Sequence, residues 1–256
     1  MTDFRALHIP GNPLVLVNAW DAASARVVEA AGAAAIATTS AGVAWSLGAR
    51  DGNAVDRDAA VAAVARITAV VSVPVTADVE SGHGDVGATI RGIRAAGAVG
   101  VNLEDGGPDL AAHVARIEQA RAADPDVFIN ARTDTFLRGF GGLEETLERA
   151  AAYLAAGADG IFVPGVTDPE IVAELVKRIA GPVNVMAGPG APPIGELAKL
   201  GVARVSLGSS VAEAAYSLVR RVAEAALRTG DYAELAGADG YGDLNALFPP
   251  GASGRG

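Results

Sequence analysis

The chain has 256 residues, of which half are apolar, and its 30 acidic and 20 basic side chains give a formal net charge of −10. A chain of this length buries enough surface to fold without a disulfide or a structural metal. It contains no cysteine, which excludes a disulfide scaffold, a thiolate zinc site, an iron–sulfur site and a cysteine nucleophile. Its acidic pI of about 4.8 argues against nucleic acids and anionic membranes as partners.

The first residues show no secretory signal, because Asp3 and Arg5 are followed by prolines rather than by an apolar run. The longest uncharged stretch, residues 30–49, consists mostly of Ala, Gly, Ser and Thr. Although this stretch is as long as a membrane helix, its composition is typical of a strand followed by a loop. We therefore expect a cytoplasmic protein without a membrane-spanning segment.

Short apolar runs alternate with long helical patterns, and such runs are typical of parallel strands buried on both faces. The predicted strands are Leu14–Asn18, Ala34–Thr38, Val73–Ala77, Val99–Leu103, Val127–Ala131, Gly160–Val163, Val183–Met186 and Arg204–Leu207. The predicted helices are Ala22–Ala31, Arg57–Val70, Asp85–Ala96, Asp109–Ala122, Leu143–Ala156, Pro169–Ile179, Pro193–Leu200 and Ser210–Arg228. Gly32, Gly97, Gly157 and Gly201 each follow a helix, where a left-handed backbone conformation ends it.

Eight strand–helix units in one chain predict a (β/α)₈ barrel. An open doubly wound sheet is the alternative, but its first turn normally carries a GxGxxG segment, and residues 18–24 here read NAWDAAS. No linker divides the sequence, so we expect a single domain over residues 1–256. Residues 229–256 are predicted to form an extension with one small helix and a loose end.

Acidic residues gather after the predicted strands, where such barrels place their chemistry. Asp51, Asp78, Glu80 and Glu104 are predicted to share one rim. Two carboxylates about 5 Å apart repel by roughly 3 kcal/mol at a dielectric near 20, so four together need a counter-charge or a raised pKa. Oxygen ligands without a histidine cage favour Mg²⁺, or Mn²⁺, over zinc. Taken alone, each acid is better explained as a helix cap or a solvated charge.

A cation and a histidine lie beside these acids. Arg132 follows the fifth predicted strand, where it can clamp a carboxylate or phosphoryl group, or act as a counter-ion to Glu104 or Asp134. His83 is a candidate substrate contact, wall residue or acid/base group. The other two histidines, His8 and His113, are expected to be surface or packing residues.

Small residues follow the second predicted strand. Thr39, Ser40 and Ala41 can offer hydroxyls and backbone N–H groups to an anion, or can form an ordinary turn. Candidate wall residues of the pocket are Trp20, Trp45, His83, Phe136, Phe162 and Asn184. We place Trp20 and Asn184 among the substrate-binding residues, with core packing as the alternative for Trp20.

Five segments, in order, resemble motifs of the isocitrate lyase/phosphoenolpyruvate mutase superfamily. They are NAWDAASAR (18–26), TSAGVA with LGARD (39–44 and 47–51), DVESGHG (78–84), VNLED (101–105) and ARTD (131–134). The first two resemble the family's first strand–helix junction and its substrate-carboxylate loop. The last three resemble its D-x-[DE]-x-G-[YFH]-G, L-E-D and A-R-T-D motifs. The resemblance extends over most of the chain, from Val15 to Val205.

The resemblance implies a (β/α)₈ barrel whose last helix is often swapped between subunits. It also implies a homo-oligomer, either a dimer or a dimer of dimers such as a homotetramer. For the metal it implies Mg²⁺ bound directly by Asp78, with Asp51, Glu80 and Glu104 acting largely through water.

For the substrate, the resemblance implies that Thr39, Ser40, Ala41 and Arg132 hold an α-keto or α-hydroxy acid. The chemistry shared by the family makes or breaks a bond next to a metal-bound, pyruvate-like enolate. The metal and the arginine would stabilise the charge of that enolate.

The chain departs from the family after Glu104. Isocitrate lyases carry a gating loop there with a proton-donating Cys, and the mutases carry a Lys. The corresponding segment of this chain, residues 104–113, is short and contains neither a Cys nor a Lys. Isocitrate cleavage by the usual route and phosphoryl migration are therefore disfavoured.

The leading interpretation is a Mg²⁺-dependent lyase that cleaves or forms a C–C bond of a 2-oxo or 2-hydroxy carboxylic acid. The residues predicted to be catalytic are Asp51, Glu80, Glu104, Arg132 and His83. One alternative is a phosphonopyruvate or phosphoenolpyruvate mutase or hydrolase, and another is a barrel that binds oxoacids with little turnover. The sequence leaves open the substrate and the proton donor, for which His83, His113, a water and a tail tyrosine are candidates.

Overall fold

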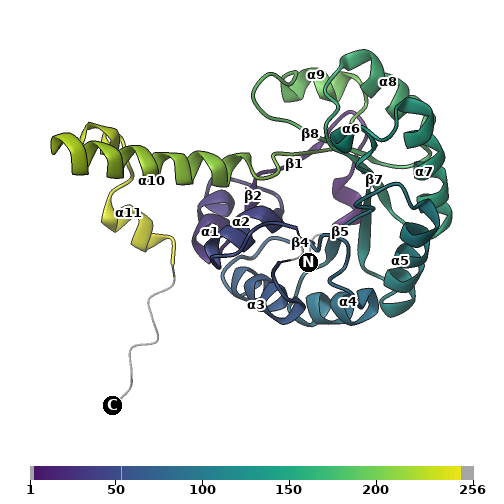
Figure 1. Cartoon of the computed structure of the whole chain (residues 1–256), viewed down its shortest axis with the longest axis horizontal. Coiled ribbons are helices and arrows are strands. Elements are labelled where there is room, and N and C mark those ends of the chain that lie inside the picture. Colours follow the sequence, from purple (N-terminus) through teal and green to yellow (C-terminus); the bar gives the residue numbers. More distant parts are fainter. Residues whose placement is uncertain (1–2, 53, 249–256) are drawn as a thin grey trace.

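The computed structural model describes residues 3–52 and 54–248 and shows a barrel of parallel strands surrounded by helices (Figure 1). The strands are β1 (Leu14–Leu16), β2 (Asn18–Ala19), β3 (Ile36–Thr38), β4 (Val75–Asp78), β5 (Gly100–Glu104), β6 (Phe128–Arg132), β7 (Gly160–Val163), β8 (Val183–Met186) and β9 (Arg204–Ser206). The predicted (β/α)₈ barrel is confirmed, and the open doubly wound sheet is wrong. Each of the eight predicted strands is present, the first as two pieces.

The barrel closes through its interrupted first strand. The piece β1 pairs with β9 and the piece β2 pairs with β3, so the sheet has no free edge between the last strand and the first. The side chain of Asn18 bridges the same seam, because its Nδ2 donates to Thr38 O at 2.9 Å and its Oδ1 accepts from Leu207 N at 3.0 Å. A side chain thus replaces ladder hydrogen bonds at the interruption.

The helices that follow the strands match the predicted ones. They are α1 (Ala22–Ala30), α3 (Arg57–Thr68), α4 (Val86–Ala95), α5 (Leu110–Ala123), α7 (Leu143–Ala155), α8 (Pro169–Arg178), α9 (Ile194–Lys199) and α10 (Ser210–Thr229). The side chain of an aspartate caps the start of five of them, at Asp21, Asp56, Asp85, Asp109 and Asp168. These caps satisfy N–H groups that a helix start leaves without a partner.

Five short helical elements complete the described chain: η1 (Arg5–Leu7), α2 (Ser40–Ser46), α6 (Thr135–Arg138), η2 (Ala233–Leu235) and α11 (Tyr241–Ala246). The segment after β3 was expected to be a loop, and α2 corrects that expectation. The predicted small helix of the extension is α11. The loose end expected after Phe248 lies outside the described residues. Within the described ranges, no helix is both long and apolar enough to cross a bilayer.

The amino-terminal segment packs against one end of the barrel. His8 stacks on Phe128 with ring centroids 4.2 Å apart, and Phe4 meets both rings edge-on. Burial lowers the pKa of His8 to about 4, so this histidine is a neutral packing residue. These aromatic side chains therefore fill the end of the barrel opposite to the one where the strands terminate.

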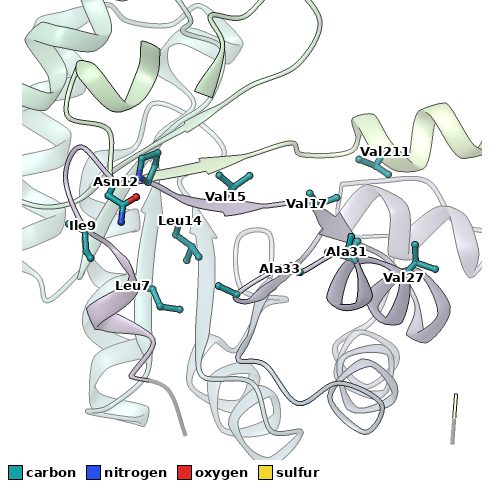
Figure 2. Close-up of a pocket in the computed structure, with 14 residues that line it drawn as sticks. Leu7, Ile9, Asn12, Leu14, Val15, Val17, Val27, Ala31, Ala33 and Val211 are labelled. Atoms are coloured by element: carbon teal, nitrogen blue, oxygen red, sulfur yellow. The ribbon is translucent and has the colours of Figure 1, made fainter. Parts of the chain in front are cut away.

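The last long helix, α10, projects away from the barrel (Figure 1). Tyr216 near its start packs against Trp20 and Trp45, each 6.2 Å away between ring centroids. Beyond this contact Val219 and Leu227 are 64% and 87% exposed. The helix leaves an apolar groove of about 630 Å³ uncovered between β1 and α1 (Figure 2). Its lining includes Val15 of β1, Val17 between β1 and β2, Val27 of α1, Ala31 directly after α1, and Val211 at the start of α10.

Candidate active site

A pocket of about 230 Å³ opens at the carboxyl ends of the strands. Six of the predicted site residues line it: Thr39, Ser40, Ala41, Asp51, Asp78 and Arg132. They come from the start of α2 and the residue before it, the loop after α2, and the ends of β4 and β6. Segments distant in sequence therefore meet at one rim, as expected for this kind of barrel.

Asp78 ends β4 with its carboxylate held on both sides. Its Oδ2 accepts a hydrogen bond from Ser40 N at 3.2 Å, and its Oδ1 faces Glu80 N at 3.4 Å. Its backbone N–H donates to Thr38 Oγ1 at 2.8 Å. These contacts fix the carboxylate at the pocket wall and leave acceptor capacity on both oxygens.

The turn after Asp78 has a strained backbone. Glu80 and His83 have φ values of 50° and 48°, in the left-handed region that non-glycine residues rarely occupy. The Glu80 carbonyl accepts from Glu104 N at 2.9 Å and ties the turn to β5. Ser40, Asp78, Glu80 and His83 surround a water-sized cavity of about 20 Å³ beside the main pocket. Burial lowers the pKa of His83, and the charge of Asp78 opposes this effect.

Arg132 is fixed by two carboxylates. Its Nε donates to Asp134 Oδ1 at 2.6 Å, and its Nη1 lies 3.0 Å from Glu104 Oε2. The guanidinium also lies over the ring of Phe162, 5.8 Å from its centroid. Arg132 is therefore a counter-ion to Glu104 and Asp134, and it also lines the pocket, where its role as an anion clamp stays a prediction.

Glu104 has a strongly perturbed carboxyl group. Burial raises its pKa to about 7, with Arg132 lowering it and the charges of Asp78 and Asp134 raising it further. A carboxyl group with this pKa exchanges its proton near neutral pH, as an acid/base group must.

A second, fully buried cluster supports the rim, and the sequence did not reveal it. Asp105 Oδ1 accepts from Asp134 N at 3.0 Å, while its Oδ2 accepts from Tyr153 OH at 3.0 Å and from Arg149 Nη1 at 3.2 Å. Arg149 also donates to the carbonyls of Gly107 and Pro108. The short loop after β5 is therefore held by one buried guanidinium. Only the position of Asp105 next to Glu104 could have suggested its role.

Two predicted substrate-binding residues lie outside the pocket lining. Trp20 packs behind α2, where a Cβ added to Gly42 would lie only 2.7 Å from the Trp20 Cβ. Asn184 is buried inside the barrel and accepts from Ser206 Oγ at 3.3 Å. His113, a suggested proton donor, is buried against Tyr153, and burial lowers its pKa to about 3.

Other pocket residues were not assigned to the site from the sequence. Besides the expected wall residue Phe162, they include Asn18, Asn102, Met186, Ser206 and Ser209. Asn18 and Asn102 stand at or near the ends of predicted strands, but the sequence analysis assigned ligand roles to the neighbouring charged residues and not to these amides.

The oxygen atoms at the rim suit a hydrated Mg²⁺. Within the described residues, no three His, Asp or Glu side chains are grouped closely enough to ligate one ion directly. Asp78 and Asp51 both line the pocket, and Glu104 lies close enough to Asp78 for their charges to interact. Mg²⁺ usually keeps several waters and binds through one or two carboxylates. One direct ligand with water-mediated neighbours therefore fits this donor set.

Comparison with known proteins identifies the family. The phosphoenolpyruvate phosphomutase family matches residues 4–227. The chain belongs to the isocitrate lyase/phosphoenolpyruvate mutase superfamily. An uncharacterized protein of Mycobacterium tuberculosis is 42% identical over 212 residues, covering 80% of this chain and 81% of that protein. The 2-methylisocitrate lyase of Escherichia coli is 32% identical over 200 residues, covering 70% and 67%. The predicted membership is thus confirmed, and with it an enzyme of the superfamily's lyase and mutase type.

Solved structures of the superfamily share the barrel. A candidate lyase/mutase from Burkholderia cenocepacia is 38% identical with a TM-score of 0.90, covering 97% of this chain and 95% of that one. A phosphonopyruvate hydrolase in complex with oxalate and Mg²⁺ is 25% identical with a TM-score of 0.83, covering 96% and 93%.

The buried Arg149 predicts a large loss of stability on its removal. Arg149→Met leaves the Asp105 carboxylate without its cation, which should lower the free energy of unfolding by about 3–5 kcal/mol. Arg178→Met is the matched control, because Arg178 pairs with Glu144 on the surface, and it should cost less than about 1 kcal/mol. Urea unfolding measures both variants, and equal losses would contradict a buried network.

Glu104 predicts a pH-dependent stability in the metal-free protein. Its folded pKa of about 7 lies above the unperturbed value of 4.5. The contribution of Glu104 to the free energy of unfolding is therefore fully present below pH 4.5 and is lost as the pH rises through about 7. With EDTA present, the free energy of unfolding of Glu104→Gln relative to the wild type should rise from about pH 5 to about pH 8. A constant difference in urea unfolding over this range would show that Glu104 titrates normally.

Proposed function

We propose that the protein is a Mg²⁺-dependent lyase that cleaves or forms a C–C bond of a 2-oxo or 2-hydroxy carboxylic acid through a pyruvate-like enolate. The observation that carries the proposal is one pocket in which Asp78, able to bind a cation, faces Arg132, able to bind an anion. An oxoacid chelated to a divalent cation needs both partners. Phosphonopyruvate hydrolase, which binds oxalate and Mg²⁺, supports this assignment.

The metal would be held by Asp78 directly and by Asp51, Glu80 and Glu104 through water. When bound, Mg²⁺ supplies positive charge for the developing enolate oxygen. Mn²⁺, which accepts the same oxygen ligands, is an expected substitute.

Arg132 and the residues at the start of α2 would bind and orient the acid. Asp134 and Glu104 hold the guanidinium at a fixed angle, so little reorganisation is needed when negative charge develops nearby. Thr39, Ser40 and Ala41 line the same pocket and would position the substrate carboxylate.

The group that exchanges a proton with the bound acid would lie at the rim and not on the loop after β5. That loop contains no Cys or Lys, and Arg149 holds two of its carbonyls. Glu104 exchanges a proton near neutral pH in the metal-free protein, because burial raises its pKa to about 7. His83 beside the small cavity is the other candidate acid/base group.

Proton NMR of the purified protein tests the proposal with a panel of acids, with Mg²⁺ or with EDTA. The panel contains oxaloacetate, 2-methylisocitrate, isocitrate, alkylated malates and phosphonopyruvate. Metal-dependent release of pyruvate or another oxoacid supports the lyase. Release of phosphate or formation of a phosphono product would instead establish the mutase or hydrolase. Line broadening of oxoacids with Mg²⁺ but without turnover would indicate a binding protein.

Asp78→Asn tests the metal ligand. The variant should lower Mg²⁺-dependent turnover more than about a hundredfold and weaken Mg²⁺ binding in calorimetry, while the melting temperature stays close to that of the wild type. Asp58→Asn is the control, because Asp58 lies on the surface of α3 with its side chain 91% exposed. A loss of folding in Asp78→Asn would make Asp78 structural, and unchanged Mg²⁺ binding would remove it from the metal site.

We also propose that a second copy of the chain covers the groove between β1 and α1 with its own α10. A (β/α)₈ barrel needs a helix over this part of the sheet, and α10 begins at the groove but projects away from it (Figures 1 and 2). The apolar groove and the exposed apolar residues of α10 are complementary in character. Mutual exchange of the helix would give a symmetric dimer, which can pair again into a tetramer.

Val27→Asp tests this assembly by placing a charge in the groove. Light scattering should give the wild type at least twice the 25.6 kDa of one chain and shift Val27→Asp toward a single chain. Leu47→Asp is the matched control on a surface leucine outside the groove and should keep the wild-type mass. A wild-type mass of one chain would refute the exchange.

A further inference from the structure

A guanidinium is buried inside the barrel below the pocket. Arg204 begins β9 and is 0% exposed, and among the described residues its guanidinium makes one hydrogen bond, from Nη2 to Asn102 Oδ1 at 3.0 Å. Its Nε and Nη1 have no partner among the described residues. Burial lowers its pKa to about 9, and the charge of Asp78 opposes this effect, so the group stays protonated at neutral pH. A buried guanidinium with so few hydrogen bonds is not well explained by a role in stability.

Arg204 fixes the orientation of the Asn102 amide. A guanidinium only donates hydrogen bonds, so the Asn102 atom that faces it must be Oδ1. Asn130 donates from Nδ2 to the same oxygen at 2.8 Å. Because both neighbours donate to Oδ1, the Nδ2 group of Asn102 is turned away from them. A flip of the amide would place this N–H donor against the N–H donors of Arg204 and Asn130.

The free side of Asn102 faces the pocket. Asn102 lines the pocket together with Asp78 and Arg132, lies beside Asp78 in the strand register, and precedes Glu104 by two residues on β5. In the described part of the chain, no side chain or carbonyl accepts a hydrogen bond from Asn102 Nδ2. An amide donor thus lies unused in the same pocket as the Asp78 carboxylate and the Arg132 guanidinium.

We propose that Asn102 donates a hydrogen bond from Nδ2 to an oxygen of the bound carboxylic acid, and that Arg204 is the positioning residue that turns the amide toward it. The inference rests on the proposed function, because it takes the pocket to bind an oxoacid. It adds a neutral donor on the floor of the pocket, opposite the solvent. Such a donor favours ligands with an oxygen directed inward and rejects those with an apolar group there.

Calorimetric titration of oxalate in the presence of Mg²⁺ tests the inference on the full chain. Asn102→Ala should weaken oxalate binding about tenfold or more, the worth of one hydrogen bond to a charged acceptor. Arg204→Met should weaken it to a similar extent. In the double variant, Arg204→Met should add nothing to the effect of Asn102→Ala, because it acts through that amide. Additive losses would overturn the positioning role.

Two controls separate positioning from a general defect. Arg204→Lys keeps a buried donor and should restore most of the oxalate affinity that Arg204→Met loses. Arg178→Met removes a surface arginine outside the pocket and should bind oxalate as the wild type does. An equal loss in Arg204→Lys and Arg204→Met would count against donation to Asn102.

A measurement on the wild type covers the case in which Arg204→Met does not fold. The side-chain amide resonances of Asn102, identified by their loss in Asn102→Ala, should shift when oxalate is added with Mg²⁺. Unshifted resonances while oxalate binds would overturn the inference and leave the proposed function intact. If the wild type does not bind oxalate with Mg²⁺, the oxoacid pocket itself is wrong and the inference falls with it.

Discussion

The buried carboxylate of Asp134 is the constraint on which the rim depends. It has no exposure to solvent, so its charge must be balanced by protein groups. Arg132 and Arg138 both donate to its oxygens, and its own backbone N–H reaches the Asp105 carboxylate. Because Asp105 is held by Arg149 and Tyr153 in turn, one network fixes the pocket arginine and the loop after β5 together. The geometry of the site is therefore a consequence of satisfying buried charge.

The sequence predicted those parts of the molecule that local patterns determine. Continuous apolar runs located the strands, glycines located the helix ends, and acids after strands located the rim. The segment around α2 was missed because SAGVAWS consists of small residues without a helical period. Trp20 was placed in the pocket because it follows a strand, but its ring turns to Tyr216, a contact nearly two hundred positions away in the sequence.

The roles of the buried polar residues could not be predicted either, because these roles also depend on contacts distant in the sequence. Arg149, Arg204 and Asn102 lie within helical or strand patterns, and their roles come from partners on other elements. In the sequence Asn18 is only the last residue of a predicted strand. In the structure its amide joins the two sides of the barrel seam. A single sequence shows which residues can form hydrogen bonds but does not show which ones the fold brings together.

The anchored loop after β5 has a consequence for kinetics. Enzymes that close a loop over the substrate exclude water during the reaction, and a loop tied down at Gly107 and Pro108 is poorly suited to such a movement. An intermediate in a pocket without a moving cover partitions between its next chemical step and reaction with solvent. Protonation of a carbanion by water is an acceptable outcome of that competition, whereas the transfer of a phosphoryl group would be lost to hydrolysis. Under the proposed function, the fixed loop would favour those reactions of the family whose intermediate can be protonated by water.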